Sequence, residues 1–420
     1  MEFKELKLDT RILEGLDMMG ISKLTPIQEE AIPKILEGKN IIGASQTGTG
    51  KTAAFLVPVM QKLLENHKPD TIQCLILSPT RELAKQIDSQ IMGIGFYTGL
   101  SSVSVIGGGS PQEWDQQEKG LKNKCDIIVA TPGRLLMHLN LEYVDFSGID
   151  VLVIDEADRL LELGFQEDIK TIVSKVPETR QNLLFSATMP PKVKKLTSWV
   201  MEEAEQIRIS PSQPATKVYQ VAYLAEDRDK SALLKHLGEK ENIESMIVFT
   251  GRKKNVNVLA KEFSKLGFSA EGIHSDKTQE EREEALRLFK GGKLNVLVAT
   301  DILARGIDIE GVSHVVNYEA PRDVEDYIHR IGRTARAEKK GVAITFVSPD
   351  EVKGFKKLEG ELENPIDKKN IPEEIGKQPN VSYFFAAPQK HQPGKKSGNK
   401  PPLKKKNPSG SGKNRRNQKP

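Results

Sequence analysis

Runs of consecutive apolar residues alternate along the chain with longer stretches in which apolar residues have helical spacing. The runs of the first half are NIIGA (40–44), CLILS (74–78), VSVI (103–106), DIIVAT (126–131), VLVID (151–155) and NLLFS (182–186). Continuous apolar strands separated by helices are typical of a parallel sheet that is covered on both faces. Residues 1–209 are therefore predicted to form one α/β domain.

The same alternation begins again after SPSQPAT (210–216), a segment rich in Pro and Ser. Its runs are MIVFT (246–250), EGIH (271–274), VLVAT (296–300), HVVNY (314–318) and VAITFV (342–347). The economical interpretation is two tandem α/β domains, 1–209 and 218–362, joined by a linker over 210–217. Such an arrangement allows a cleft between the domains.

Charge is distributed unevenly along the chain. From Gln389 to Pro420 there are nine Lys, two Arg and no acidic residue, so residues 1–388 hold 51 basic and 58 acidic side chains. The same segment is rich in Pro, Gly, Ser and Asn and has almost no apolar residues to offset the entropy of ordering. We predict a polar, basic and largely disordered tail over residues 363–420.

Several protein classes are excluded by the sequence. No apolar run approaches the roughly 18 residues of a membrane span, and the N-terminus MEFKELKLDT lacks the regions of a signal peptide. A cytoplasmic protein without membrane contacts is therefore expected. Cys74 and Cys125 lie in or beside apolar runs, so we interpret them as core residues and not as a disulfide. No cluster with metal-ligand spacing is present in the sequence.

The segment SQTGTGKT (45–52) lies between the run NIIGA and a helical stretch, at a strand end where parallel sheets gather functional groups. Strand, glycine loop, Lys-Thr and helix are the parts of a phosphate-binding loop, in which Lys51 reaches the β/γ oxygens and Thr52 binds Mg²⁺. A chance glycine turn with a solvated lysine is the alternative. Ser45 stands where Gly or Ala is usual. The predicted nucleotide-binding residues are Ser45, Gln46, Thr47, Gly48, Thr49, Gly50, Lys51 and Thr52.

Three carboxylates follow the run VLVI at another strand end: Asp155, Glu156 and Asp158. Beside a phosphate-binding loop, Asp155 is suited to hold Mg²⁺, and Glu156 is suited to orient and deprotonate the water that attacks the γ-phosphate. The alternative is a helix N-terminus that carries acidic residues because they suit the helix dipole.

With these residues, the chain resembles the DEAD-box RNA helicases of superfamily 2, of the bacterial type with a short basic tail. The resemblance covers nearly all of residues 3–350, and the motifs follow the order of the family. It implies two tandem RecA-like domains, each a parallel sheet covered by helices, with ATP and Mg²⁺ as ligands. It makes Lys51, Asp155 and Glu156 catalytic.

The segment GISKLTPIQ (20–28) resembles the part of the family that recognises adenine. This resemblance implies that Gln28 reads the base and that the upstream aromatic Phe3 stacks on it. Leu24 stands in place of a family proline. For Phe3, an ordinary core position is an equally open alternative.

The resemblance also implies an RNA track built from both domains. PTRELA (79–84), GGG (107–109) and TPGR (131–134) line it in the first domain, and FTGRKKN (249–255), QEER (279–282) and ATDILARGIDI (299–309) continue it in the second. Hydroxyl, glycine N–H and guanidinium groups suit phosphates and sugars and carry no base information. An ordinary turn is the alternative for each first-domain motif taken singly. The implied RNA-binding residues are Arg81, Gly108, Thr131, Arg134, Thr250, Gly251, Gln279, Arg282, Thr300 and Asp301.

The remaining motifs are implied to couple the two domains. SAT (186–188) resembles the coupling segment, with Ser186 and Thr188 bonded to Asp158, and Asp308 corresponds to a residue that reaches the ribose. HRIGRTAR (329–336) supplies the arginine fingers Arg333 and Arg336, although Ala335 stands where the family often has Gly. A solvated basic helix face is the alternative for these two arginines.

The implied function is RNA-stimulated ATP hydrolysis coupled to local, largely sequence-independent unwinding of short RNA duplexes or remodelling of RNA–protein particles. The expected partner is structured or duplex RNA, bound through its backbone; DNA is not expected, and no protein partner can be read from the sequence. Two alternatives stay open. One is a DNA-translocating ATPase of superfamily 2, and the other is an ATP-controlled RNA clamp or annealer without productive unwinding.

Overall fold

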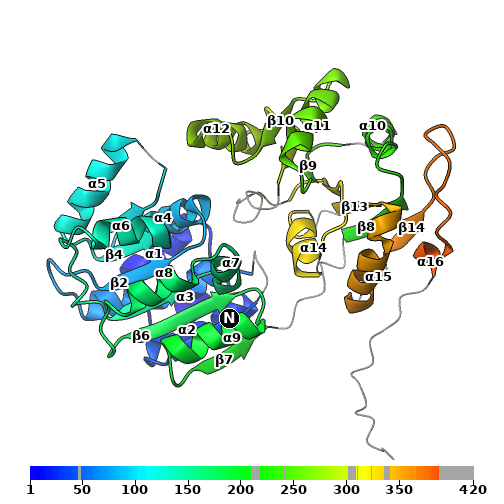
Figure 1. Ribbon diagram of the computed structural model, residues 1–420. Coiled ribbons are helices and arrows are strands. Elements are labelled where there is room, and N and C mark those ends of the chain that lie inside the picture. Colours follow the sequence, from blue (N-terminus) through cyan, green and yellow to red (C-terminus); the bar gives the residue numbers. More distant parts are fainter. Residues whose placement is uncertain are drawn as a thin grey trace, which may run out of the picture.

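The computed structural model describes residues 1–45, 49–108, 110–209, 218–240, 243–300, 309, 311–322, 324–334, 341–362, 364 and 366–386. Within these residues the chain forms two sheets of seven parallel strands each, in separate lobes (Figure 1). This arrangement confirms the predicted pair of α/β domains. The predicted linker 210–217 and the basic segment 387–420 lie outside the described residues.

The first sheet has the strand order β3-β4-β2-β5-β6-β1-β7. Its strands are β1 (Ile41–Ala44), β2 (Cys74–Leu77), β3 (Ser102–Val105), β4 (Ile127–Ala130), β5 (Val151–Ile154), β6 (Gln181–Ser186) and β7 (Glu205–Arg208). The first six match the predicted runs to within one residue at each end. The sequence analysis missed β7 because EQIR has one apolar residue, Ile207, which is the only buried position of this edge strand.

Helices cover both faces of the first sheet. One core is formed with the turn η1 (Phe3–Glu5) and the helices α1 (Thr10–Met18), α2 (Pro26–Leu36), α3 (Lys51–Glu65) and α4 (Arg81–Ile94). The other core is formed with α5 (Pro111–Lys122), α6 (Pro132–Leu139), α7 (Ala157–Glu162), α8 (Gln166–Val173) and α9 (Pro191–Val200). Cys74 and Cys125 are free and buried, in agreement with the sequence analysis.

The second sheet has the order β10-β11-β9-β12-β13-β8-β14. Its strands are β8 (Val218–Leu224), β9 (Met246–Phe249), β10 (Ala270–Ile273), β11 (Val296–Ala299), β12 (His314–Asn317), β13 (Gly341–Val347) and β14 (Asp367–Lys369). The helical elements around it are α10 (Lys230–Lys240), α11 (Lys253–Lys265), α12 (Gln279–Lys290), α14 (Val324–Ile331), η2 (Pro349–Glu351), α15 (Val352–Glu361) and α16 (Ser382–Phe385). No helix in the described part of the chain is long and apolar enough to cross a membrane.

The predicted end of the second domain at residue 362 is wrong. Strand β14 pairs in parallel with β8, and Ile366, Ile371 and Phe384 are 3%, 5% and 0% exposed. These three apolar side chains pack into the core of the second domain, but they are scattered among polar residues. Such a sparse pattern does not indicate a strand or helix, so the sequence analysis placed the segment in the tail.

A buried ion cluster also holds the end of this segment. Lys356 and Lys368 each form an ion pair of 2.6 Å with Glu359, which is fully buried, and both ammonium groups donate to the carbonyl oxygen of Ala386. The folded part of the second domain therefore extends to about residue 386.

This boundary can be tested by truncation. A chain that ends after residue 386 should unfold at the same temperature as the full chain, because it keeps the apolar residues 366, 371 and 384. A chain that ends after residue 362 loses the burial of three large side chains, each worth about 1.5–3 kcal/mol, and exposes Phe355. Its second domain should therefore unfold at a clearly lower temperature in a calorimetric scan. Equal unfolding temperatures for the two truncated chains would contradict the boundary.

Candidate functional site

The strand order arranges the predicted motifs in a row along the C-terminal edge of the first sheet. The residues that follow β3, β4 and β2 belong to the predicted RNA track, and those that follow β6 and β1 belong to the coupling segment and the phosphate-binding loop. The carboxylates follow β5, in the middle of the row. Adjacent strands lie roughly 4.8 Å apart. A nucleotide and an RNA strand bound side by side along this edge would therefore reach all of these motifs.

The phosphate-binding loop is described at its two ends, whereas Gln46, Thr47 and Gly48 lie outside the described residues. Gly50 has a φ of 88° and forms the N-cap of α3. The Ser45 hydroxyl bonds to that of Thr49 at 2.9 Å, so the serine at the unusual position closes the loop. Lys51 is 7% exposed, and its ammonium donates to the Ser45 carbonyl oxygen at 2.7 Å. The lysine charge is thus enclosed at the loop, where phosphates would lie.

Gln28 packs directly on this loop. Its Nε2 donates to the Gly50 carbonyl oxygen at 3.0 Å, and its Oε1 accepts from the Thr25 N–H at 2.8 Å. Each polar end of the amide is therefore oriented by one bond to the protein, and one N–H and one oxygen lone pair remain for contact with a base.

The position of Phe3 corrects the expectation that it stacks on adenine. Its side chain is 2% exposed and belongs to the core beneath α1, α2 and α3. No face of the ring is open to a base in this structure. The core alternative is the one that the structure supports, because Phe3 is one of the largest apolar side chains near the N-terminus and its burial anchors that segment.

Asp155 and Glu156 are poorly solvated, and the backbone of Glu156 is strained. Burial, and next the neighbouring Glu156, raise the pKa of Asp155 to about 7. Burial also raises the pKa of Glu156, while Lys51 acts in the opposite direction. Glu156 has a φ of 46° and a ψ of 54°, a left-handed conformation that a side chain with a Cβ adopts at a cost. Such a conformation is also found at Asp70, Lys124 and Glu142, so at Glu156 it is consistent with a functional residue without being specific for one.

The pair of predicted metal ligands suits Mg²⁺. Asp155 is a buried carboxylate whose charge is unfavourable without a cation, and Thr52 adds a hydroxyl at the start of α3. Among the described residues, no three His, Cys, Asp or Glu side chains gather closely enough to hold a metal ion by themselves. A cation there would therefore draw further ligands from phosphate oxygens and water, which is the usual manner of Mg²⁺.

Asp158 makes the bonds that the coupling role requires. Its Oδ2 accepts from both the N–H and the hydroxyl of Thr188, each at 2.9 Å. Ser186 contacts the backbone of Asp158, since its hydroxyl accepts from the Asp158 N–H at 3.2 Å. The Ser186 carbonyl oxygen accepts from the Ser45 N–H at 3.1 Å, so the phosphate-binding loop and the coupling segment are directly bonded.

Arg81 and Gly108 of the predicted RNA track lie in contact. Gly108 has a φ of 75°, and a Cβ at this position would lie 2.3 Å from the Arg81 Nη1. Among the residues that the structure describes, Nε and Nη2 of Arg81 are buried without a hydrogen-bond partner, and Glu113 lies 4.0 Å from the guanidinium. Guanidinium donors in this state are ready to bind an anion. Thr131 is buried as the N-cap of α6 and makes no side-chain cap bond.

Arg134 is held by two residues of α5 that the sequence analysis missed. Its guanidinium carbon lies 4.1 Å from the centroid of the Trp114 ring, and its Nε donates to Gln117 Oε1 at 2.8 Å. One signal in the sequence could have indicated these contacts: Trp114 is a large aromatic residue in a largely polar helix. It precedes Gln117 by three residues, so the two side chains lie on the same face of α5.

In the second domain the predicted RNA-contacting groups after β9 are already bonded to a carboxylate. Glu319 accepts from the Thr250 hydroxyl at 3.2 Å, the Gly251 N–H at 3.1 Å and the Asn255 amide at 3.2 Å. The sequence analysis missed Glu319, although an acid directly after the run HVVNY lies at the functional edge of the sheet. A phosphate would have to displace this carboxylate to reach the same donors.

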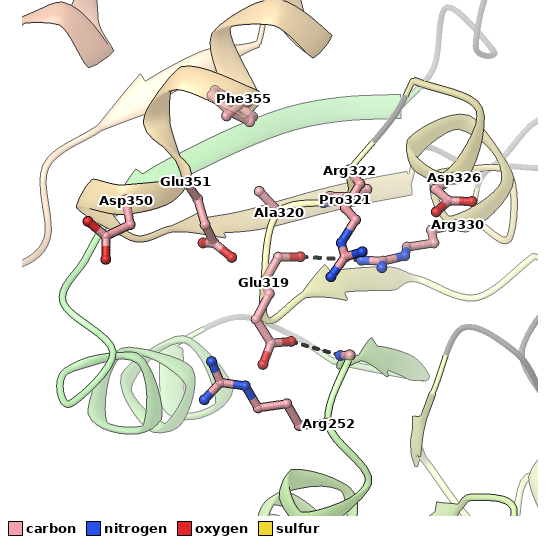
Figure 2. A pocket seen from close by; sticks show the side chains of 12 residues that line it. Arg252, Glu319, Ala320, Pro321, Arg322, Asp326, Arg330, Asp350, Glu351 and Phe355 are labelled. Atoms are coloured by element: carbon pink, nitrogen blue, oxygen red, sulfur yellow. Dashed lines mark hydrogen bonds between the residues drawn. The ribbon is translucent and has the colours of Figure 1, made fainter.

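Beside Gly251 lies a cavity of about 550 Å³, which borders the predicted track. Arg252, Arg322 and Arg330 line it together with four acidic residues, and Arg330 donates to the Glu319 carbonyl oxygen at 3.3 Å (Figure 2).

The N-terminal end of α12 meets α4 of the first domain. Gln279 Nε2 donates to Glu82 at 3.3 Å, and Lys85 forms an ion pair with Glu283. Arg282 donates to the Ser275 carbonyl oxygen at 3.0 Å, and Thr300 is buried at the end of β11. Asp301 lies outside the described residues.

Arg333 follows α14 in the second domain, is 6% exposed, and donates from Nε to the His329 carbonyl oxygen at 3.3 Å. Burial raises the pKa of Glu156, and the charge of Arg333, after that of Lys51, acts in the opposite direction. Arg333 therefore acts electrostatically on a carboxylate of the first domain. Asp308 and Arg336 lie outside the described residues.

Comparison with known proteins agrees with this geometry. Residues 25–196 match the family model of the DEAD/DEAH box helicase, and residues 229–338 match that of the helicase conserved C-terminal domain. The chain is 42% identical over 371 residues to the DEAD-box ATP-dependent RNA helicase CshA of Bacillus cereus, an alignment that covers 88% of this chain and 70% of the relative. The CshA of Bacillus subtilis is 41% identical, with coverages of 88% and 74%.

A solved structure is similar in both domains. Dbp5 of S. cerevisiae bound to RNA and ADP BeF3 superposes with a TM-score of 0.76 at 31% sequence identity, and the match covers 89% of this chain and 96% of that one.

The environment of His138 predicts a pH-dependent stability. The ring is fully buried and stacks on Trp114 at 4.1 Å, and burial, followed by the Arg134 charge, lowers the pKa of His138 to about 4 from an ordinary 6.5. The folded state therefore binds fewer protons than the unfolded state between these values, and the free energy of unfolding should fall as the pH drops from about 6.5 to about 4. His138→Gln should lose less stability than the natural chain over this interval in urea titrations.

Parallel profiles for the natural chain and His138→Gln would contradict the assignment.

Proposed function

We propose that this chain, which belongs to the DEAD-box family of ATP-dependent RNA helicases, couples RNA-stimulated ATP hydrolysis to local, largely sequence-independent separation of short RNA duplexes. The observation that carries the proposal is the row of motifs on one sheet edge, with Asp155 and Glu156 between the enclosed Lys51 and the arginines of the predicted RNA track. A single substrate pair bound along this row contacts both halves.

Lys51 binds the β- and γ-phosphates of ATP, and Gln28 reads the adenine with the amide N–H and the oxygen lone pair that its bonds to Gly50 and Thr25 leave unused. Thr52 and Asp155 would hold Mg²⁺, which offsets phosphate charge when it is bound with the nucleotide. Glu156 orients the attacking water and accepts its proton. The raised pKa of Glu156 suits a group that must take up a proton during the reaction.

Hydrolysis depends on the second domain because Arg333 belongs to it. A guanidinium beside the γ-phosphate stabilises the charge of the transition state, an effect worth roughly 10³–10⁵ in rate. The influence of Arg333 on the pKa of Glu156 supports this role. Arg336 is proposed as a second finger on the strength of the sequence motif alone.

RNA binds through its backbone to Arg81, Gly108 and Arg134 in the first domain and to residues of α12 in the second. These groups carry no base information, so sequence preference should be low. ATP and RNA each contact both domains and therefore stabilise one closed arrangement together, which is coupling by linkage. Release of phosphate removes this joint stabilisation and lets the product strand leave.

A strand-displacement assay beside an ATPase assay tests this function. A short RNA duplex should be separated in an ATP-dependent manner, and single-stranded RNA should stimulate hydrolysis more than single-stranded DNA. Hydrolysis without strand displacement would favour the clamp or annealer, and equal stimulation by DNA would favour the DNA-translocating class.

Two substitutions separate binding from chemistry. Lys51→Ala should abolish hydrolysis and weaken ATP binding, because it removes the cation at the phosphates. Glu156→Gln keeps a similar shape and should retain ATP and RNA binding while hydrolysis falls by at least about 10²-fold, since the proton acceptor is lost. The measurements are nucleotide affinity and single-turnover hydrolysis. Near-normal turnover in Glu156→Gln would exclude it as the base.

The contribution of the second domain can be measured with Arg333→Ala. Nucleotide affinity should stay within a few-fold, whereas RNA-stimulated hydrolysis should fall by roughly 10³-fold or more, because the finger acts mainly on transition-state charge. Arg228→Ala, which removes an arginine of the second domain whose side chain is 83% exposed, is the matched control and should not produce this loss. An equal loss in nucleotide affinity and in rate would show that Arg333 binds the ground state instead.

A further inference from the structure

One face of α5 forms a clamp on the side chain of Arg134. Trp114 and Gln117 are three residues apart on this helix and therefore share a face. The Trp114 ring covers the guanidinium at 4.1 Å, and Gln117 Oε1 accepts from Arg134 Nε at 2.8 Å. Gln117 is itself fixed, since its Nε2 donates to the Ile106 carbonyl oxygen at 3.0 Å. Trp114 thus restrains the face of the Arg134 guanidinium, and Gln117 restrains the edge that carries Nε.

The same face of α5 also packs against the next turn of α6. His138 stacks on Trp114 at 4.1 Å with an interplanar angle of 19°, and its Nε2 lies 3.2 Å from Gln117 Oε1. On its other side, His138 Nδ1 bonds to the Tyr143 hydroxyl. Because Arg134 and His138 are four residues apart on α6, the indole bridges two adjacent turns and fixes the helix as well as the side chain.

These restraints leave the functional end of Arg134 available. No hydrogen-bond partner holds its two Nη atoms within the described residues, and the Cβ of Arg134 lies 4.0 Å from the position that a Cβ on Gly107 would take. The neighbouring charges that act on the guanidinium are those of Glu113 and Arg81. The clamp therefore holds Nε and one face of the guanidinium and leaves the two Nη groups for an RNA phosphate.

We infer that Trp114, together with Gln117, is a positioning residue for RNA binding, which holds the Arg134 guanidinium in the orientation that meets an RNA phosphate. This inference rests on the proposed function, because it presupposes that Arg134 contacts RNA. An arginine side chain loses much rotamer freedom when it binds an anion, and a preformed stack removes that loss from the binding step. Trp114 does not touch ATP, so its effect should be confined to RNA.

The test measures ATPase rate against RNA concentration for the full chain, which separates the half-stimulating RNA concentration from the maximal rate. In Trp114→Ala the half-stimulating concentration should rise roughly three- to tenfold, as expected for loss of a cation–π stack and of side-chain order, and the maximal rate should stay within about twofold. Trp114→Phe keeps an aromatic face and should recover most of the affinity.

A double-mutant cycle identifies the partner. Arg134→Ala should raise the half-stimulating RNA concentration at least as much as Trp114→Ala, and the two changes together should do no more than Arg134→Ala alone. Trp199→Ala is the matched control, because Trp199 is the other tryptophan of the chain, lies on α9 and also has a lysine, Lys170, near its ring at 5.8 Å. This variant should behave as the natural chain does.

Each outcome has a distinct meaning. If Arg134→Ala raises the RNA requirement and Trp114→Ala does not, or if the two effects add, the positioning role is overturned and the proposed RNA track is kept. If Arg134→Ala has no effect, the RNA contact fails and the inference fails with it. Thermal unfolding and RNA-free nucleotide affinity should be measured for every variant. A fall in maximal rate and nucleotide affinity in Trp114→Ala would show a merely structural role and overturn the inference.

Discussion

The buried carboxylate of Asp155 and the partly buried carboxylate of Glu156 are not fully compensated by the first domain when they are ionised. Burial is the largest cause of the raised pKa of both, and the Lys51 charge only partly opposes it. A carboxylate in this position is stabilised by any additional cation. The cations can arrive with the nucleotide or with the second domain, whose Arg333 already acts on Glu156. Nucleotide binding and domain closure therefore both bring positive charge to the same two carboxylates, and for this reason each favours the other.

Direct bonds link the phosphate-binding loop to the segment proposed to couple the domains. Ser45 donates to the carbonyl oxygen of Ser186, the Ser186 hydroxyl accepts from the Asp158 backbone, and Asp158 accepts twice from Thr188. The Ser186 hydroxyl also donates to the Thr188 carbonyl oxygen at 2.7 Å. Because these bonds are short and share residues, a displacement of the loop on loss of phosphate has to move the coupling segment or break the network.

Strands buried on both faces were predictable because their apolar runs are continuous, and the motifs at their ends were predictable because parallel strands share an edge. Three strands escaped prediction, although the edge strands β3 and β10 did not. β7 and β14 bury little, so their sequences carry little apolar signal, and the apolar run of β8 is interrupted by Gln220. Phe3 shows the limit of motif reasoning, since an aromatic near a binding segment and an aromatic in the core look alike in sequence. Glu319 and Trp114 contribute to the site through contacts with other elements, and such contacts have no local pattern.

The left-handed backbone at Glu156 makes this position a point of conflict between stability and activity. A residue with a Cβ adopts such a conformation at a cost of roughly 1–2 kcal/mol, whereas glycine adopts it freely and asparagine more readily than most residues. Laboratory evolution for thermostability alone would therefore favour Gly or Asn at position 156 and discard the carboxylate that is proposed to accept the proton. Engineering of this enzyme for use at higher temperature has to hold position 156 fixed and gain stability elsewhere, away from the edge of the sheet where the strain is stored.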